Sequence, residues 1–181
     1  GMNGKVDNSI YFSGTASSYM RFPHNDGIEL DDQSFSIALW FKSPGNIADS
    51  YFLHKGMHDE AFGGNGKWIG LQYKNEKLTF AVDDDIVKSN LDVSGAKKWF
   101  DNKWHHVVCV RDREEEKLLV YIDGVEVGSR TDLTTQGIGV TTDLIIGNCD
   151  GYFNTPYPGN IDDLRIYGSA LTSHEVYDLY E

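Results

Sequence analysis

The chain has 181 residues, of which 40% are hydrophobic and 13% aromatic, so it can build a substantial core and is not expected to be disordered. Its formal net charge of -12 argues against nucleic acid as a partner, because phosphate binding needs a basic face, and it also disfavours an anionic membrane surface. No segment approaches the roughly 18 consecutive apolar residues of a membrane span, so membrane insertion is not expected. An acidic chain is compatible with neutral sugars, with calcium, or with a plain solvated surface.

The N-terminus and the two cysteines say little about location. The first residues lack the charged and apolar regions of a secretory signal, but Gly1 before Met2 is typical of a cloning remnant, so export stays open. Cys109 and Cys149 are too few for a disulfide framework, and two unpaired thiols are favoured over one bridge.

The first half of the chain predicts short strands separated by turn residues. Residues 34–42 alternate most clearly, with an apolar set on one face and a mixed set containing Trp40 on the other. Similar patterns predict further strands over residues 9–13, 19–22, 51–55, 67–73 and 77–82.

The second half continues this pattern and ends differently. Strands are predicted over 103–110 and 117–122, followed by an Asp123-Gly124 turn and another strand, and then over 143–147 and 161–167. A single short helix is predicted near residues 172–180. There Thr172 and Glu175 have the spacing of a capping box, and Leu171 and Val176 have that of a hydrophobic staple.

Many short strands with alternating faces and Gly-rich turns indicate an all-β fold of two packed antiparallel sheets, a sandwich or jelly roll. No linker, repeat or low-complexity tract divides the chain. We therefore expect a single domain over residues 1–181 with a short C-terminal helix.

Five segments, in order, resemble the laminin-G-like domains of the concanavalin A-like lectin and glucanase superfamily. They are residues 10–14, 34–42, 103–107, 120–124 and 159–175, so the resemblance covers nearly the whole chain. It implies a jelly-roll sandwich. It also implies binding of glycans or proteins, a place in secreted or surface-exposed proteins (extracellular, periplasmic or cell-surface), and in many members a structural calcium. The chain departs from the family by having only residues 1–8 before the first segment.

Catalysis is the weaker expectation. Glycoside hydrolases need two carboxylates flanking the scissile bond, and the Glu-x-Asp-x-x-Glu strand of the glucanase branch does not occur in the sequence. Adjacent His105 and His106 would point to opposite faces of a strand and could not act as a pair. A non-catalytic carbohydrate-binding module is therefore the main hypothesis, ahead of a protein-interaction or adhesion domain and, further behind, a glycoside hydrolase.

A calcium ion is expected near the last predicted strand. Parity places Asp162 with the apolar Leu164 and Ile166, and a carboxylate turned toward a core must be hydrogen-bonded or bound to metal. Calcium accepts carboxylate and carbonyl oxygens together, so Asn25 and Asp26 are candidate partners for Asp162, as is the segment 7–8. The alternative is that Asp162 only accepts backbone amides.

Sugar recognition would use aromatic rings with nearby hydrogen-bonding groups. Trp68 shares its predicted face with Gly70 and Gln72, opposite the apolar set of its strand, so it should leave the main core. The other candidates lie in charged or Gly- and Pro-bounded segments: Trp99, Tyr152, Phe153, Asn154 and Tyr157. Local packing under loops is the alternative for each ring.

Overall fold

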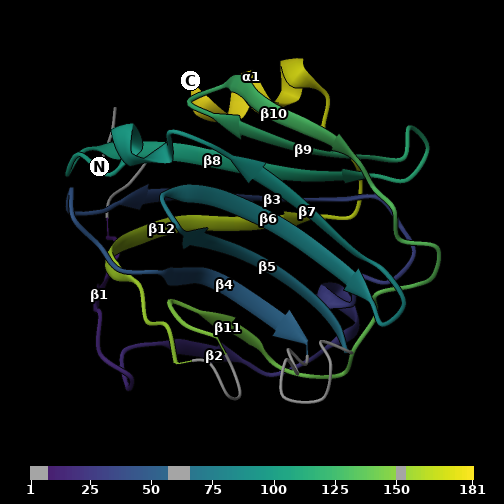
Figure 1. Cartoon of the computed structure of the whole chain (residues 1–181), viewed down its shortest axis with the longest axis horizontal. Helices are drawn as coiled ribbons and strands as arrows, with labels where there is room; N and C mark the ends of the chain where they lie inside the picture. The colour runs from purple at the N-terminus through teal and green to yellow at the C-terminus, as the bar shows by residue number, and fades with distance from the viewer. Residues whose placement is uncertain (1–7, 57–65, 150–153) are drawn as a thin grey trace.

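A computed structural model describes residues 8–56, 66–149 and 154–181 as a sandwich of two antiparallel six-stranded sheets (Figure 1). Across the described residues, no helix is long and apolar enough to cross a membrane. The strands are β1 (Ile10–Ser13), β2 (Met20–Phe22), β3 (Phe35–Lys42), β4 (Ser50–Gly56), β5 (Lys67–Lys74), β6 (Lys77–Asp84), β7 (Lys88–Val93), β8 (Trp104–Asp112), β9 (Lys117–Ile122), β10 (Val125–Thr131), β11 (Leu144–Ile146) and β12 (Pro158–Tyr167).

Each sheet combines strands from both halves of the chain. The first has the order β1-β12-β3-β8-β9-β10, and the second has the order β2-β11-β4-β5-β6-β7. Short 3-10 helices at Asp26–Ile28 and Ala96–Trp99 lie in the connections. The all-β sandwich predicted from the sequence is therefore confirmed, and β7 is a strand that the sequence reading did not predict.

The core between the sheets is built from the alternation seen in the sequence. On β3 the apolar set Phe35, Ile37, Leu39 and Phe41 enters the core, where each side chain is at most 3% exposed. At roughly 25 cal/mol per Å² of apolar surface removed from water, this shared core supplies most of the stabilisation of the fold.

The hairpin between β9 and β10 forms at the predicted Asp-Gly turn. Asp123 and Gly124 have φ of 52° and 76°, the left-handed values that a type I′ turn requires at both central positions. Their twist matches that of the flanking strands, so the turn joins neighbouring strands directly.

The C-terminal helix α1 (Ser173–Tyr180) covers the outer face of the first sheet (Figure 1). Its capping box is present as predicted, with the Glu175 amide donating to Thr172 Oγ1 and the Thr172 amide donating to Glu175 Oε2. Val176 is fully buried in a small cluster with Ala38 and Val108. The outer face of β3 and β8 is therefore occupied by the helix.

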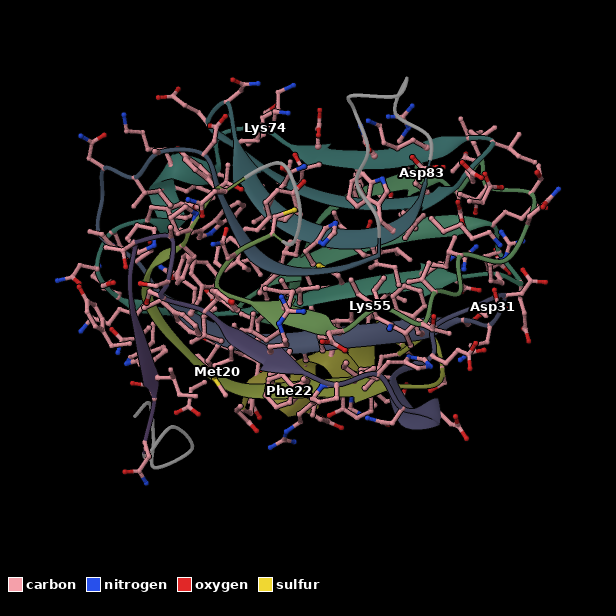
Figure 2. The ribbon with its side chains drawn as sticks, turned by 90° about the horizontal axis from the view of Figure 1, so that it is seen from below. Met20, Phe22, Asp31, Lys55, Lys74 and Asp83 are labelled. Carbon is pink, nitrogen blue, oxygen red and sulfur yellow. The ribbon has the colours of Figure 1, made fainter. Side chains whose placement is uncertain are left out.

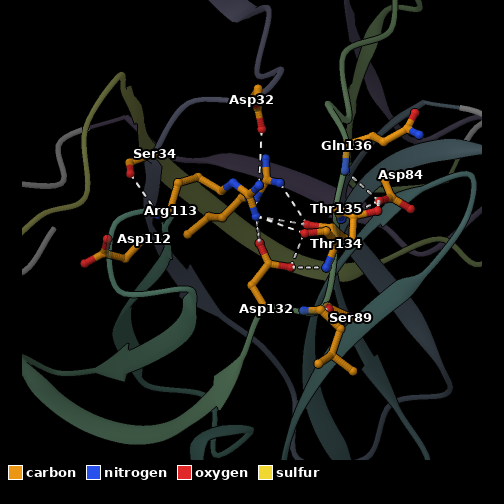
Figure 3. A network of polar contacts seen from close by, with 12 residues as sticks. Asp32, Ser34, Asp84, Ser89, Asp112, Arg113, Asp132, Thr134, Thr135 and Gln136 are labelled. Atoms are coloured by element: carbon orange, nitrogen blue, oxygen red, sulfur yellow. Dashed lines mark hydrogen bonds and ion pairs between the residues drawn. The ribbon is translucent and has the colours of Figure 1, made fainter.

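A buried polar network fastens the chain segment after β10 (Figure 3). Arg111 and Asp132 are both inaccessible to solvent, and Arg111 Nε donates to Asp132 Oδ2 over 2.9 Å. Arg111 also donates to the Asp31 carbonyl and to Thr134 Oγ1. Hydrogen bonds offset the desolvation of both charges in such a pair, and here each of the three guanidinium nitrogens of Arg111 donates one.

Cys109 and Cys149 form no disulfide bond within the described residues, as the sequence favoured. Both are buried. Cys109 lies on β8 in the core between the sheets, where burial raises the pKa of its thiol.

Candidate functional site

The outward face of β5, β6 and β7 carries polar and aromatic side chains in register. Ile69, Leu71 and Tyr73 of β5 enter the core, so Trp68, Gly70 and Gln72 face outward. Strand pairing aligns these positions into three cross-strand rows: Trp68–Asp83–Lys88, Gly70–Ala81–Asn90 and Gln72–Thr79–Asp92. Trp68 leaves the main core as predicted, but the expectation that its ring would be exposed was wrong, because the ring is only 3% exposed.

A depression of about 200 Å³ opens on this face. It is polar, with one aromatic residue and three lysines among the described residues of its wall. Those residues are Trp68, Gln72, Lys74, Asn75, Lys77, Thr79, Lys88, Asn90 and Asp92. In Figure 2, Lys74 and Asp83 are labelled in the upper part of the view, and Met20 and Phe22 of β2 in the lower part.

Trp68 is held against the sheet rather than standing free. It is only 3% exposed, its Nε1 donates to Asp83 Oδ2 over 3.2 Å, and its ring stacks on His54 with centroids 5.9 Å apart. Burial raises the pKa of Asp83, although hydrogen bonds from the Asp85 amide and Trp68 oppose the shift. Trp68 therefore contributes a fixed edge to the depression, not an open stacking platform.

Gly70 makes this position of Trp68 possible. A Cβ at residue 70 would lie 3.0 Å from Trp68 Cζ3 and 3.0 Å from Tyr51 Cε1, closer than ordinary van der Waals contact. Any larger residue would displace one of the two rings. The absence of a side chain at Gly70 therefore lets the Trp68 ring occupy its place at the edge of the depression.

The polar groups of the depression are partly engaged and partly available. Asp92 accepts from Thr79 Oγ1 over 2.8 Å and from Lys77 Nζ over 3.3 Å. Asn90 Oδ1 is buried and has no hydrogen-bond partner among the described residues. A buried carbonyl oxygen without a donor costs free energy, so a small turn of the Asn90 side chain that let a ligand hydroxyl donate to this oxygen would be favoured.

Two of the predicted aromatic contacts belong to the core instead. Trp99 is 8% exposed within the core cluster, covered by Lys98, whose Nζ lies 4.4 Å from the ring centroid. Tyr157 is fully buried against Phe52, and its hydroxyl donates to the Lys42 carbonyl. The expectation that these rings would be exposed was wrong, because residues just before and after strands also fill the space between the sheets.

Of the remaining predicted contacts, Tyr152 and Phe153 fall outside the described residues. Asn154 is exposed, and its Oδ1 accepts from Asn148 Nδ2 over 2.9 Å. Asn154 is not among the described residues that border the depression.

The predicted orientation of Asp162 was also wrong. A β-bulge between Asp162 and Arg165, with Asp163 at φ 47°, shifts the alternation of β12. Ile161 pairs with Phe41 and enters the core, while Asp162 pairs with Trp40 and shares its outward face. The extra residue of the bulge reverses the parity that the sequence suggested.

Asp162 lies beside an apolar groove of about 110 Å³ at the β1 and β2 edges, together with Asn8. Its Oδ1 accepts from the Asp163 amide, and its Oδ2 is buried without a partner among the described residues. Asn25 instead caps the 3-10 helix by accepting from the Gly27 amide. Within the part of the chain that the structure describes, no three His, Cys, Asp or Glu side chains form a metal-binding group.

The site residues that the sequence did not predict come from β5, β6, the turn between them and β7, and those on β7 belong to a strand that was itself not predicted. Lys88, Asn90 and Asp92 alternate with Ser89, Leu91 and Val93, of which only two are apolar. The alternation of polar with apolar residues could have indicated a strand here, but the segment contains too few apolar residues for the pattern to be distinct.

The fold is a jelly-roll-like sandwich of two antiparallel sheets, with a polar depression on the outward face of one of them. A laminin G family model, described as the concanavalin A-like lectin/glucanases superfamily, matches residues 13–177. The chain therefore belongs to this family. A sequence comparison with curated proteins gives no match.

Solved structures of similar fold include binding domains of several kinds. The binding domain of Paraclostridial Mosquitocidal Protein 1 has a TM-score of 0.79 at 19% identity, covering 99% of this chain and 44% of that one. Domain 4 of AbnA, a GH43 extracellular arabinanase from Geobacillus stearothermophilus in complex with arabinotriose, has a TM-score of 0.71 at 26% identity, covering 99% and 79%. The Ruminococcus gnavus IT-sialidase CBM40 bound to alpha2,3 sialyllactose has a TM-score of 0.74 at 16% identity, covering 97% of each chain.

Proposed function

We propose that this protein is a non-catalytic carbohydrate-binding domain whose glycan site is the depression on the outward face of β5, β6 and β7. The observation that carries the proposal is the grouping of amide, hydroxyl and charged side chains around the fixed edge of Trp68. Sugar sites combine a few oriented polar groups with aromatic surface in this way. Family membership and the arabinotriose complex of a 26% identical domain support it.

The same depression argues for binding rather than hydrolysis. Asp92 is the one carboxylate among the described residues that border it, and both of its oxygens are engaged by Thr79 and Lys77. Retaining and inverting glycosidases both need two carboxyl groups across the scissile bond. We therefore propose a module of a secreted or surface-exposed protein that holds a glycan without cleaving it.

The experiment is a glycan array followed by calorimetric titration of the best ligand. Asn90→Ala and Gly70→Val should each weaken binding, the first by removing an acceptor and the second by displacing Trp68 or Tyr51. Ser129→Ala, on exposed β10 of the other sheet, serves as the control. The proposal fails if the wild-type protein binds no glycan, or if a confirmed ligand binds both depression variants as tightly as the control.

We also propose that calcium binds at Asp162, with a structural role. The buried Oδ2 of Asp162, which has no hydrogen-bond partner in the described part of the chain, fits a cation ligand, and Asn8 lies beside the same groove. Bound calcium would link the start of β1 to β12. A chelator should then lower the melting temperature of the wild-type protein and not that of Asp162→Asn; an equal response of both proteins would refute the site.

A further inference from the structure

The depression differs in charge from the molecule that carries it. Its described border holds three lysines, Lys74, Lys77 and Lys88, and one carboxylate, Asp92, whereas the whole chain has a formal net charge of -12. At physiological ionic strength the Debye length is about 8 Å, so a ligand in the depression senses these near charges more than the distant acidic surface. The local field therefore favours an anion.

Two of the three lysines remain available to a ligand. Lys77 is paired with Asp92 at 3.3 Å. Lys74 and Lys88 have no ion pair within the described part of the chain, and Lys88 Nζ lies 5.9 Å from the centroid of the Trp68 ring. Both lysines are exposed, so an incoming anionic group can reach them. Lys88 also interacts with the buried carboxylate of Asp83, its partner on the neighbouring strand, so Lys74 carries less competing negative charge.

Lys74 and Lys88 lie at opposite ends of the depression, measured along the strands. Lys88 pairs across the sheet with Asp83, and Lys74 pairs with Lys77, which is six residues from Asp83 on β6. At about 3.4 Å per residue the two ends are roughly 20 Å apart along the strands. Gln72, Thr79 and Asn90 lie between them and offer groups suited to sugar hydroxyls. One small anion could not contact both ends, whereas an extended oligosaccharide with repeated acidic groups could.

We propose that the depression binds an acidic oligosaccharide whose sugar carboxylates pair with Lys74 and Lys88. This inference rests on the proposed glycan-binding function and specifies its ligand class. Trp68 and the polar side chains between the two lysines would bind the uncharged parts of the ligand. Lys74 and Lys88 would select the charged form.

The test compares each acidic ligand with its methyl ester, which removes the charge and keeps the sugar. Calorimetric titration would use oligogalacturonate and the same oligomer with its carboxylates methyl-esterified, with alpha2,3 sialyllactose against its own methyl ester as a second pair and arabinotriose as a neutral reference. We expect the acidic member of a pair to bind at least about tenfold more tightly, the ratio expected from one charge-assisted contact of about 1.5 kcal/mol. This preference should shrink as salt is raised.

Variants locate the effect on the sheet. Lys74→Gln and Lys88→Gln should each weaken binding of the acidic ligand by about tenfold and binding of the esterified ligand by much less. Lys117→Gln, on β9 of the other sheet, is the matched control. Equal binding of acidic and esterified ligands, or binding of neutral glycans alone, would overturn the charge selection while leaving glycan binding intact. No binding of any glycan would overturn both proposals.

Discussion

Asp84, at the end of β6, stabilises two turns through one carboxylate. Its Oδ1 accepts from the amides of Ile86 and Val87, and its Oδ2 accepts from those of Thr135 and Gln136 (Figure 3). Burial would raise the pKa of Asp84, but the four amides outweigh it and lower the pKa to about 2.

Replacing Asp84 with Asn should therefore destabilise the protein at neutral pH. The folded-state pKa lies below the unfolded value near 3.9, so the stabilisation is present above pH 4 and is lost as the pH falls toward 2. We expect Asp84→Asn to lower the free energy of unfolding by roughly 2 kcal/mol at pH 7 and by much less at pH 2, measured by urea denaturation. Exposed Asp85→Asn is the control; an equal loss at both pH values would contradict the charge-based account.

The stabilisation contributed by His105 should depend on pH in the opposite direction from that of Asp84. Its Nδ1 is 2.7 Å from Asp123 Oδ2 and its Nε2 is 3.2 Å from Asp101 Oδ1. Burial would lower the pKa of His105, but the two carboxylates together raise it above its ordinary value. The imidazolium ion therefore joins the β9–β10 turn to the segment before β8.

The stabilisation from His105 should be present below the unfolded pKa near 6.5 and lost as the pH rises through the higher folded value. We predict that His105→Gln is destabilised relative to wild type at pH 6 and that the difference narrows above pH 8, measured by thermal unfolding. His174→Gln, on a side chain that is 84% exposed, should change neither value. If the stability difference between wild type and His105→Gln grew with pH instead, the pKa of His105 could not be raised in the folded protein.

At the scale of elements, the connection from β10 to β11 depends on the buried Arg111–Asp132 pair. Burial would raise the pKa of Asp132, but Arg111 and Thr134 keep it below its usual range. Removing one partner leaves the other charge in a site without water.

We expect Asp132→Asn to cost about 3–5 kcal/mol in the free energy of unfolding, because Arg111 then keeps its charge without a counterion. Glu115, which is 67% exposed and pairs with Lys117, offers the surface control, and Glu115→Gln should cost less than about 1 kcal/mol. Chemical denaturation of both variants measures the contrast. Similar losses would show that burial is not what makes the pair important.

For the whole molecule, the sequence predicted the sandwich well because strand alternation and turn chemistry are local. The apolar face of β3, the Asp123-Gly124 turn and the capping box of α1 can each be read within a few residues, and all three are present. Five family-like segments in order added the topology.

The site was predicted less well because it depends on pairing between strands. Strand alternation alone predicts that Trp68 faces away from the core. Lys88 and Asn90 are brought beside it only by the pairing of β7 with β6, which the sequence does not reveal. The bulge that turns Asp162 outward depends on the pairing of β12 with β3. Tyr157 and Trp99 entered the core because space remained between the sheets, which no local pattern reveals.

The free Cys109 gives the protein an internal measure of how often its core opens. A thiol reagent attacks the thiolate, and Cys109 is 1% exposed with a raised pKa, so alkylation must wait for β8 to become accessible. With Cys149→Ala as background, the labelling rate of Cys109 should follow the global free energy of unfolding across urea concentrations. Mass spectrometry would record it, and a rate independent of urea would reveal local separation of the two sheets while the fold remains intact.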